Sequence, residues 1–186
     1  MVDLVFATKG KQIPADHAWY LSEAIKLRLP WLMSEEHAGV HLIHGAQSGN
    51  GWQQPDDDGV IELSSRTRFI LRLPKNRVED ARGSLSNHEI KIAEHRLLLL
   101  DARIRPLSPL GTVLARHVLS SSKNKNETEF LETVSDWLQK LSITPRKMLC
   151  GRVRKLSIPS KVFFTRSLLL AEINFQESID LQCKGI

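Results

Sequence analysis

The sequence of 186 residues contains only two cysteines, Cys150 and Cys183. This number excludes a disulfide scaffold and a cysteine-rich zinc site, so a reducing cytoplasm is the expected location. No apolar run approaches the roughly 20 residues that a membrane-spanning helix requires. The N-terminus carries an acid at Asp3 and lacks the long apolar stretch of a secretory signal. We therefore expect no contact with a membrane.

Two common catalytic motifs are missing. The sequence has no G-x-S-x-G elbow, which disfavours a serine hydrolase of that type. It also has no G-x-x-x-x-G-K-[ST] loop for binding nucleotide phosphates. With 41% hydrophobic residues the chain is too apolar to be disordered, so it folds into one ordinary domain or two small ones.

Acidic residues are scarce in the second half of the chain. From Arg103 to Ile186, 14 Lys and Arg stand against 7 Asp and Glu, whereas the first 102 residues hold slightly more acids than bases. Closely spaced cations repel one another unless a polyanion is their partner, so this asymmetry predicts nucleic-acid binding. A solvated basic face is the alternative, and a membrane surface fits less well because no basic amphipathic helix is evident. One stretch contains no acid and seven cations: Arg146, Lys147, Arg152, Arg154, Lys155, Lys161 and Arg166.

The hydrophobic pattern predicts a strand, helix, strand, strand, helix, strand order in the first half. Alternating apolar residues indicate strands, and apolar residues three or four apart indicate helices. Pro30 and Pro74 end a helix and a strand. The expected strands are 2–7, 39–43, 60–73 and 88–100, and the expected helices are 17–29 and 77–84.

The second half repeats this order without its last strand. Strands are expected at 113–119, 148–158 and 162–173, and helices at 127–141 and 176–182. The order of each half is that of a split βαβ, or ferredoxin-like, fold. We therefore predict an α+β protein of two ferredoxin-like domains, 1–102 and 103–186, that meet near 101–107.

Five segments, in order along the chain, resemble the CRISPR repeat-RNA endoribonucleases, the sixth CRISPR-associated protein family, and within it the Myxan-type subgroup. They are IPADHAWYLSEAIKLRLPWL, GVHLIHG, LSSRTRFILRLP, VLARHVL and ESIDLQ. The resemblance implies tandem ferredoxin-like (RNA-recognition-like) domains. In that family a glycine-rich loop and a final strand follow the last helix. This sequence ends at CKGI, where the loop would begin, so the second domain is expected to lack its last strand.

The resemblance also implies a function. The expected enzyme is a metal-independent endoribonuclease, without a cofactor, that cleaves precursor CRISPR RNA within the repeat and leaves 2′,3′-cyclic phosphate and 5′-hydroxyl ends. Its expected partner is the repeat hairpin, and other subunits of a CRISPR effector complex are further candidate partners. The expected oligomeric state is a monomer or a homodimer. The alternative is a non-catalytic RNA-binding subunit that scaffolds such a complex.

Histidine suits the proton transfers of this reaction because its unperturbed pKa is about 6.5. Of the seven histidines, His17 is the first catalytic candidate, because the family's catalytic histidine lies at or near the helix that it precedes. Lys9 and Lys11 flank a turn near it and are expected to contact RNA and lower its pKa, whereas Asp16 would oppose that shift. His41 is the second catalytic candidate. The RNA-binding candidates are Lys9, Lys11, Arg146, Lys147, Arg152, Arg154, Lys155 and Arg166.

A zinc site at His37, His41 and His44 is disfavoured. His41 falls on the expected strand 39–43 and His44 directly follows it, and a spacing of three along an extended chain directs side chains to opposite faces. Gly39 interrupts any helix that would align His37 with His41. Trp52, in a polar loop, is a candidate for stacking on a base, with packing against the protein as the alternative.

Overall fold

The computed structural model describes residues 1–45, 59–120, 126–158 and 161–184, and Trp52 lies outside them. The chain divides into two compact units, Met1–Leu107 and Ser108–Ile186. The division follows the end of a long strand, β7 (His95–Pro106), which continues past Ala102, where the sequence placed the boundary.

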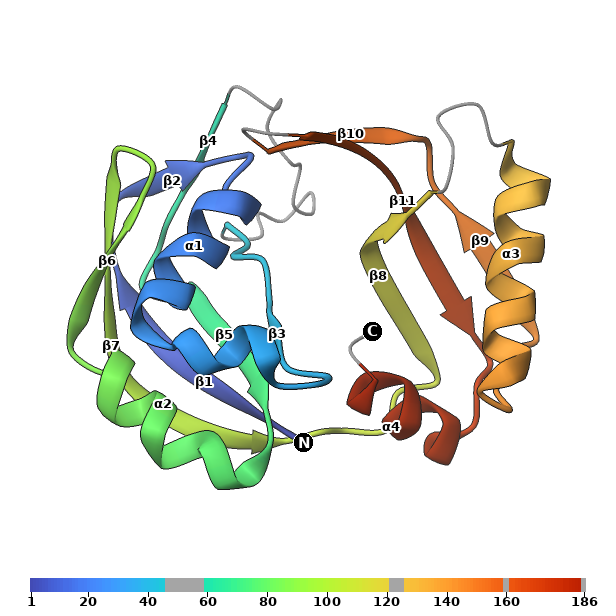
Figure 1. The fold of residues 1–186 in the computed structure, drawn as a ribbon, viewed down its shortest axis with the longest axis horizontal. Helices are drawn as coiled ribbons and strands as arrows, with labels where there is room; N and C mark the ends of the chain where they lie inside the picture. Colours follow the sequence, from blue (N-terminus) through green and yellow to red (C-terminus); the bar gives the residue numbers. More distant parts are fainter. Residues whose placement is uncertain (46–58, 121–125, 159–160, 185–186) are drawn as a thin grey trace. The chain divides into compact units, whose positions relative to one another are not determined.

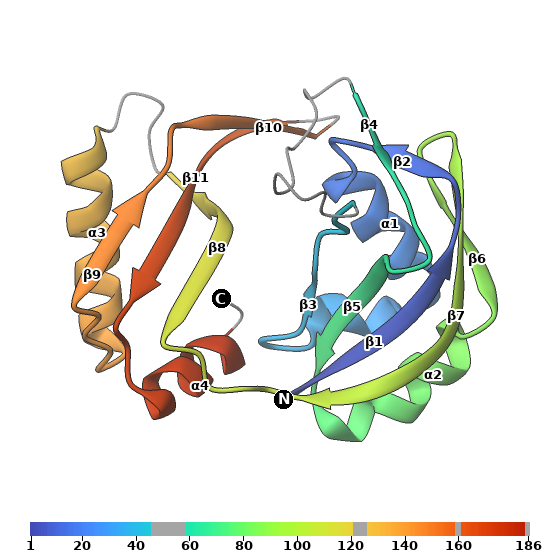
Figure 2. The ribbon, with the colours of Figure 1, turned by 180° about the vertical axis from the view of Figure 1, so that it is seen from behind.

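The first unit is built on a five-stranded antiparallel sheet with the strand order β3-β5-β1-β7-β6 (Figures 1 and 2). β1 is central and pairs with β5 on one side and β7 on the other. This order confirms the ferredoxin-like fold, to which the β6–β7 hairpin adds an edge strand and β2 and β4 add a separate ribbon. The strands are β1 (Val2–Lys9), β2 (Gln12–Pro14), β3 (Gly39–Val40), β4 (Val60–Glu62), β5 (Arg68–Leu73) and β6 (His88–Ile92).

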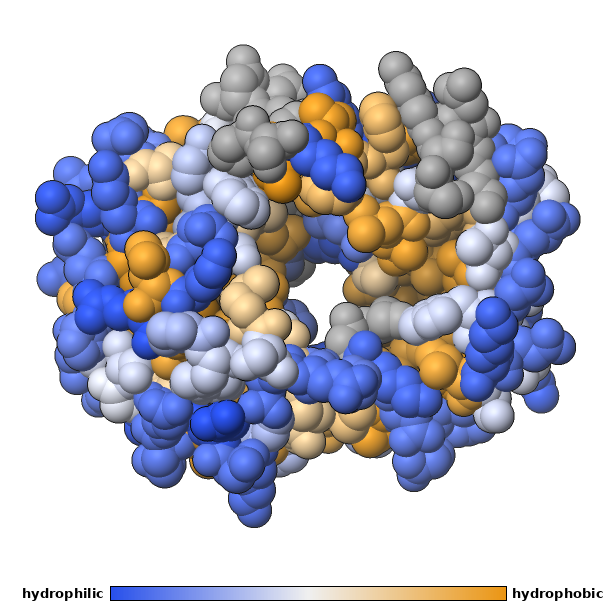
Figure 3. Space-filling view, in the orientation of Figure 1, coloured by the Kyte–Doolittle hydropathy of each residue, from blue (hydrophilic) through white to orange (hydrophobic). Residues whose placement is uncertain are grey.

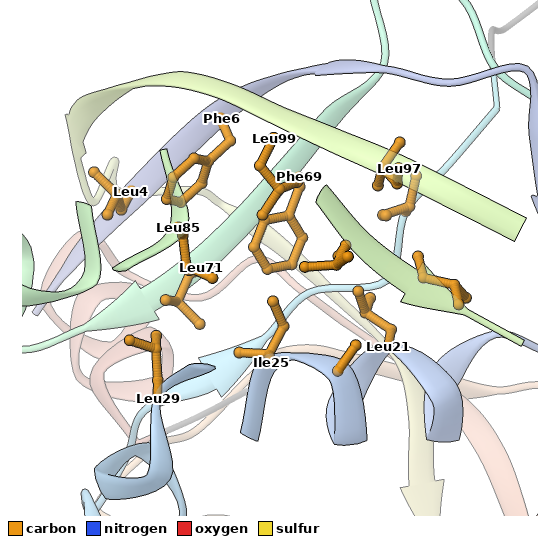
Figure 4. Close-up of a cluster of buried hydrophobic side chains, with 14 of the residues drawn as sticks. Leu4, Phe6, Leu21, Ile25, Leu29, Phe69, Leu71, Leu85, Leu97 and Leu99 are labelled. Atoms are coloured by element: carbon orange, nitrogen blue, oxygen red, sulfur yellow. The ribbon is translucent and has the colours of Figure 1, made fainter. Parts of the chain in front are cut away.

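Two helices, α1 (Ala18–Arg28) and α2 (Val78–Leu85), pack on one face of this sheet and share a hydrophobic core with it. Short 3-10 turns, η1 (Pro30–Ser34) and η2 (Lys75–Arg77), follow α1 and precede α2. Phe6 and Phe69 pack at the centre with ring centroids 5.6 Å apart (Figure 4). Burying each side chain of this size stabilises the fold by about 1.5–3 kcal/mol.

The expected strand 60–73 is wrong, because a turn divides it into β4 and β5. The Thr67 backbone N–H donates to the Ser64 carbonyl oxygen at 3.0 Å. The Ser64 N–H in turn donates to Thr67 Oγ1 at 3.0 Å. Serine and threonine side chains compete in this way with strand pairing. The strand expected at 39–43 is also shorter than predicted, although the His41 N–H still donates to the Ile70 carbonyl oxygen of β5 at 3.0 Å.

The second unit has the same order of elements around a central strand, β11. β8 pairs with one edge of β11, and β9 and β10 pair one after the other with its opposite edge (Figure 1). The expected strand 148–158 is therefore two strands, separated where the Gly151 N–H donates to the Ser167 carbonyl oxygen at 2.9 Å. The elements are β8 (Thr112–Leu119), α3 (Glu127–Lys140), β9 (Lys147–Cys150), β10 (Arg154–Ile158), β11 (Lys161–Ala171) and α4 (Phe175–Cys183).

This unit confirms the second ferredoxin-like fold without its last strand. In the first unit β7 pairs with β1, whereas in the described part of the second unit β8 pairs with β11 alone. α3 contributes Phe130, Val134 and Leu138 to a core shared with β11. The Asn126 side chain caps α3 by accepting from the Glu129 N–H. No helix within the described ranges is long and apolar enough to cross a membrane.

Candidate functional site

His17 lies at the N-terminal end of α1, but its imidazole is only 3% exposed. Its Nδ1 is 3.0 Å from the Pro14 carbonyl oxygen and 3.2 Å from that of Ala15, so Nδ1 carries the proton and donates. Its Nε2 accepts from the Ile43 backbone N–H at 3.0 Å. Both ring nitrogens are therefore engaged with backbone groups. The ring is thus held by the fold in this structure, and the catalytic role of His17 stays a prediction from the sequence.

The pKa of His17 is lowered, as the sequence predicted, but for a different reason. Burial disfavours the charged imidazolium and is the largest cause, while the carbonyls of Pro14 and Ala15 and the carboxylate of Asp16 oppose the shift. The expected influence of Lys9 and Lys11 is not among its causes. A neutral imidazole that accepts from Ile43 fixes the segment that carries His41.

We expect His17→Ala to destabilise the first unit by about 2–4 kcal/mol, because it leaves buried backbone groups without their partners. A lowered folded pKa means that the unfolded chain binds more protons just below pH 6.5, so stability falls as the pH decreases from there. The variant should lose part of this acid sensitivity, whereas His95→Ala, on the β6–β7 hairpin, should retain it. Thermal unfolding above and below pH 6.5 measures both, and an unchanged pH dependence in His17→Ala would contradict the structural role.

His41 lies near three charged side chains on the sheet face opposite the helices, of which Asp3 and Arg72 are buried and Arg105 is half-exposed. The Asp3 carboxylate accepts from Arg72 Nε at 2.8 Å and from Arg105 Nη2 at 2.9 Å. Asp3 is the cross-strand partner of both arginines, so the three residues form a row across β5, β1 and β7. Burial alone raises the pKa of Asp3, but the hydrogen bonds from the two arginines outweigh it and leave the pKa below its usual range.

The pKa of His41 is lowered as well. Burial is the largest cause, and the charges of Arg72 and Arg105 add to it, while Asp3 acts in the opposite direction. The imidazole is therefore neutral near pH 7 and able to accept a proton. Of the two histidines predicted from the sequence, His41 is partly exposed and has the electrostatic surroundings of a general base.

His37 was discussed above only as a possible zinc ligand. It is exposed, has a backbone φ of 66°, and places Nε2 3.4 Å from Glu36 Oε1. A left-handed backbone is uncommon outside glycine and is often found at functional sites. No pattern in the sequence indicates this conformation. Asn87, Ala93, Ser142 and Glu172 share this conformation, so the candidacy of His37 for proton transfer rests on its exposure and on its position four residues before His41 in the sequence.

Most of the predicted RNA-binding side chains are exposed. Lys147 is exposed, but its Nζ forms an ion pair with Glu172 at 2.5 Å. Arg166 is different, because it is only 8% exposed and its Nη1 donates to the Gly151 carbonyl oxygen at 2.9 Å. The guanidinium stabilises the β9–β10 connection in this structure, and the RNA contact expected of Arg166 stays a prediction. The exposed members are Lys9, Lys11, Arg146, Lys147, Arg152, Arg154 and Lys155.

Comparison with known proteins gives the same two-part architecture. A chain described as CRISPR-associated protein Cas6 superposes with a TM-score of 0.56 at 11% identity, covering 96% of this chain and 90% of that one. A protein described as a RAMP protein binding different RNA substrates gives 0.55 at 13% identity, covering 92% and 88%. A Cas6-related protein of Pyrococcus furiosus gives 0.53 at 9% identity, covering 95% and 89%. These likenesses establish the tandem ferredoxin-like fold.

The sequence comparisons are more specific. The model of the Cas6 family, described as Cas6 Crispr, matches residues 2–186. The CRISPR-associated endonuclease Cas6 of Myxococcus xanthus strain DK1622 is 25% identical over 185 residues, covering 100% of this chain and 75% of the relative. The chain therefore belongs to the Cas6 family of CRISPR-associated proteins.

Proposed function

We propose that this chain is an endoribonuclease that cleaves precursor CRISPR RNA within the repeat. The observation that carries the proposal is the unbroken family match over residues 2–186, together with a relative that is named an endonuclease and matches along the whole chain. The 2′-hydroxyl of the nucleotide before the scissile bond attacks the adjacent phosphate. The products carry a 2′,3′-cyclic phosphate and a 5′-hydroxyl.

The proton transfers are assigned to His41 and His37. A neutral His41 accepts the 2′-hydroxyl proton, since burial and the nearby arginines disfavour its charged form. Arg105, whose side chain is 48% exposed and whose charge lowers the pKa of His41, is the cation proposed to stabilise the charge of the transition state. His37 is the candidate acid for the 5′-oxygen leaving group. His17 positions the segment after β3 that carries His41, through its bond to Ile43.

The repeat RNA is bound mainly through its phosphates by the exposed lysines and arginines. The strongest support is the stretch from Arg146 to Arg166, which has no acid to neutralise its cations within the stretch. Each phosphate contact contributes a salt slope of roughly one unit, so binding weakens steeply as salt rises. A hairpin fits this mode of binding, because the phosphates of a stem are regularly spaced.

One observation favours a second candidate, a non-catalytic RNA-binding subunit of an effector complex. Both ring nitrogens of His17, the histidine first expected to be catalytic, are hydrogen-bonded to backbone groups. Such a subunit would need the basic stretch but no proton-transfer group. The two candidate functions differ in whether His41 and His37 are needed for RNA cleavage.

Incubation with a panel of repeat RNAs in the presence of a chelator tests the proposed function. We expect cleavage at one position in the matching repeat, at the same rate with and without EDTA, because the attacking and leaving groups are served by side chains alone. Acid treatment should open the cyclic phosphate and shift the mobility of the upstream product. Loss of activity with EDTA would contradict metal independence, and binding without cleavage of any repeat would favour the scaffold.

A further inference from the structure

A groove of about 490 Å³ runs along the first unit between α1 and the edge strand β6. Residues from Tyr20 to Arg28 of α1 form one wall, and residues from Glu89 to Glu94 of the β6–β7 hairpin form the other. Within the described residues β6 pairs with β7 alone, so its other side is an open edge of the sheet. An open strand edge beside a groove is a place where a further strand can add to the sheet.

The strand register shows which backbone groups of β6 face this groove. Ile92 and His95 are cross-strand partners on either side of a two-residue hairpin turn, and such partners form a hydrogen-bonded pair. Hydrogen-bonded pairs alternate along a strand, so the N–H and C=O groups of Glu89 and Lys91 point to the open edge. Arg28 Nη2 of α1 lies 3.5 Å from the Glu89 carbonyl oxygen, in agreement with this direction. A contact of this length is weak, and it leaves the carbonyl available to a stronger donor.

Two exposed hydrophobic side chains lie on the α1 wall of the groove. Leu27 is 82% exposed and Tyr20 is 45% exposed. The two residues are two helical turns apart, and the small Ala24 lies between them on the same stripe of α1. Single exposed hydrophobic residues are ordinary, but a stripe of them beside an open strand edge is a surface for protein contact. Hydrophobic surface, orange in Figure 3, shows over the region of α1 and β6.

The charges of β6 are complementary to those of a second copy of the same strand. Ile90 packs in the core under α1, so its neighbours Glu89 and Lys91 have their exposed side chains on the opposite face of the sheet. If two copies of β6 pair antiparallel with Ile90 opposite Ile90, Glu89 of each copy lies opposite Lys91 of the other. This register also joins the N–H and C=O groups that point to the open edge. An edge lysine ordinarily discourages strand pairing, but here it gains an opposite charge.

We propose that a second copy of this chain occupies the groove, and that the two β6 edges pair antiparallel to join two sheets into one. The α1 stripes then also run antiparallel, so Leu27 of each copy packs against Tyr20 of the other about the small Ala24. The same surface serves both copies, which gives a closed dimer with every contact made twice. This inference goes beyond the proposed function, because it uses none of the residues assigned to RNA binding or cleavage.

Sedimentation velocity of the full chain over a series of concentrations tests the proposal. The wild-type chain is expected to pass from monomer to dimer between about 1 and 100 μM, as suits an interface of modest size. Leu27→Arg is expected to weaken the dimer about 100-fold or more, because both copies lose a buried apolar contact. Met33→Arg is the matched control. Met33 is 63% exposed on η1, outside the lining of the groove, so this variant should dimerise as the wild type does.

Charge reversal tests the strand register. Lys91→Glu and Glu89→Lys are each expected to weaken self-association about tenfold or more, because the symmetry sets like charges opposite each other twice. An equimolar mixture of these two variants should recover the wild-type affinity as a heterodimer. The double variant Glu89→Lys/Lys91→Glu should recover it as a homodimer. Lys75→Glu makes the same change of charge at an exposed position of η2 and should leave the affinity unchanged.

Three results would overturn the proposal. A wild-type chain that stays monomeric at every concentration would exclude a second copy as the occupant of the groove. A dimer that Leu27→Arg and Lys91→Glu weaken no more than their controls do would use a different surface. Failure of both the mixture and the double variant to recover affinity would contradict the antiparallel register. Circular dichroism confirms the fold of each variant, and if one does not fold, the other substitution decides the test.

Discussion

Replacing His41 with alanine is expected to lower the rate of repeat cleavage by about two to four orders of magnitude, the usual contribution of one placed proton-transfer group. Affinity for the repeat should change little, because His41 is neutral near pH 7 and adds no charge to the phosphate-binding surface. Single-turnover cleavage measures the chemical step, and a filter-binding titration measures affinity.

His95→Ala is the matched control, since it removes the same side chain from the β6–β7 hairpin, at the opposite edge of the sheet from β3. It should cleave at the wild-type rate. If His37 protonates the 5′-oxygen leaving group, His37→Ala is expected to slow cleavage by about the same factor as His41→Ala. A His41→Ala variant as fast as His95→Ala would remove His41 from the mechanism.

The largest effect on stability is expected from Asp3→Ala. The substitution removes the carboxylate from the Arg72 guanidinium, whose side chain is only 9% exposed, and breaking a buried pair on one side costs about 3–5 kcal/mol. Because Asp3 also raises the pKa of His41, its loss should move the acidic limb of the pH–rate profile to lower pH. Hydrogen exchange in β1 and β5 is the suitable measure, since two units need not unfold together.

Glu89→Ala provides the comparison for an exposed ion pair. Glu89 accepts from Arg96 at 2.8 Å, but their side chains are 50% and 75% exposed, so the loss should be below about 1 kcal/mol. The double variant Asp3→Leu/Arg72→Met should recover most of the stability lost in Asp3→Ala, because it removes both charges from the interior. Equal destabilisation by Asp3→Ala and Glu89→Ala would contradict the buried role of Asp3.

Hydrophobic periodicity predicted the elements of the fold better than their interruptions. The helix expected at 127–141 is α3, Glu127–Lys140, because its apolar stripe and its first-turn acids agree. The turn between β4 and β5 was missed, since its Ser and Thr residues are also common in strands. The strand β2 was missed as well, because a strand of three residues that ends in a proline carries too little periodicity.

The candidate site was less predictable, because burial depends on contacts far apart in the sequence. His17 was correctly placed at the start of α1, but its partner Ile43 is 26 residues away. Arg166 belongs to a basic stretch, yet it lies within a sheet and donates to Gly151. The row of Asp3, Arg72 and Arg105 appears only once strand register is known. Register brings Arg154 beside Thr165 in the same way.

The most direct test of the central claim is cleavage of a repeat RNA that carries a single 2′-deoxynucleotide before the scissile phosphate. If the chain uses the 2′-hydroxyl as its nucleophile, cleavage of this RNA should fall below detection while its affinity stays within about twofold of the all-ribose RNA, since the phosphates that dominate binding are unchanged. Cleavage of the deoxy-substituted RNA at the normal position and rate would contradict the account.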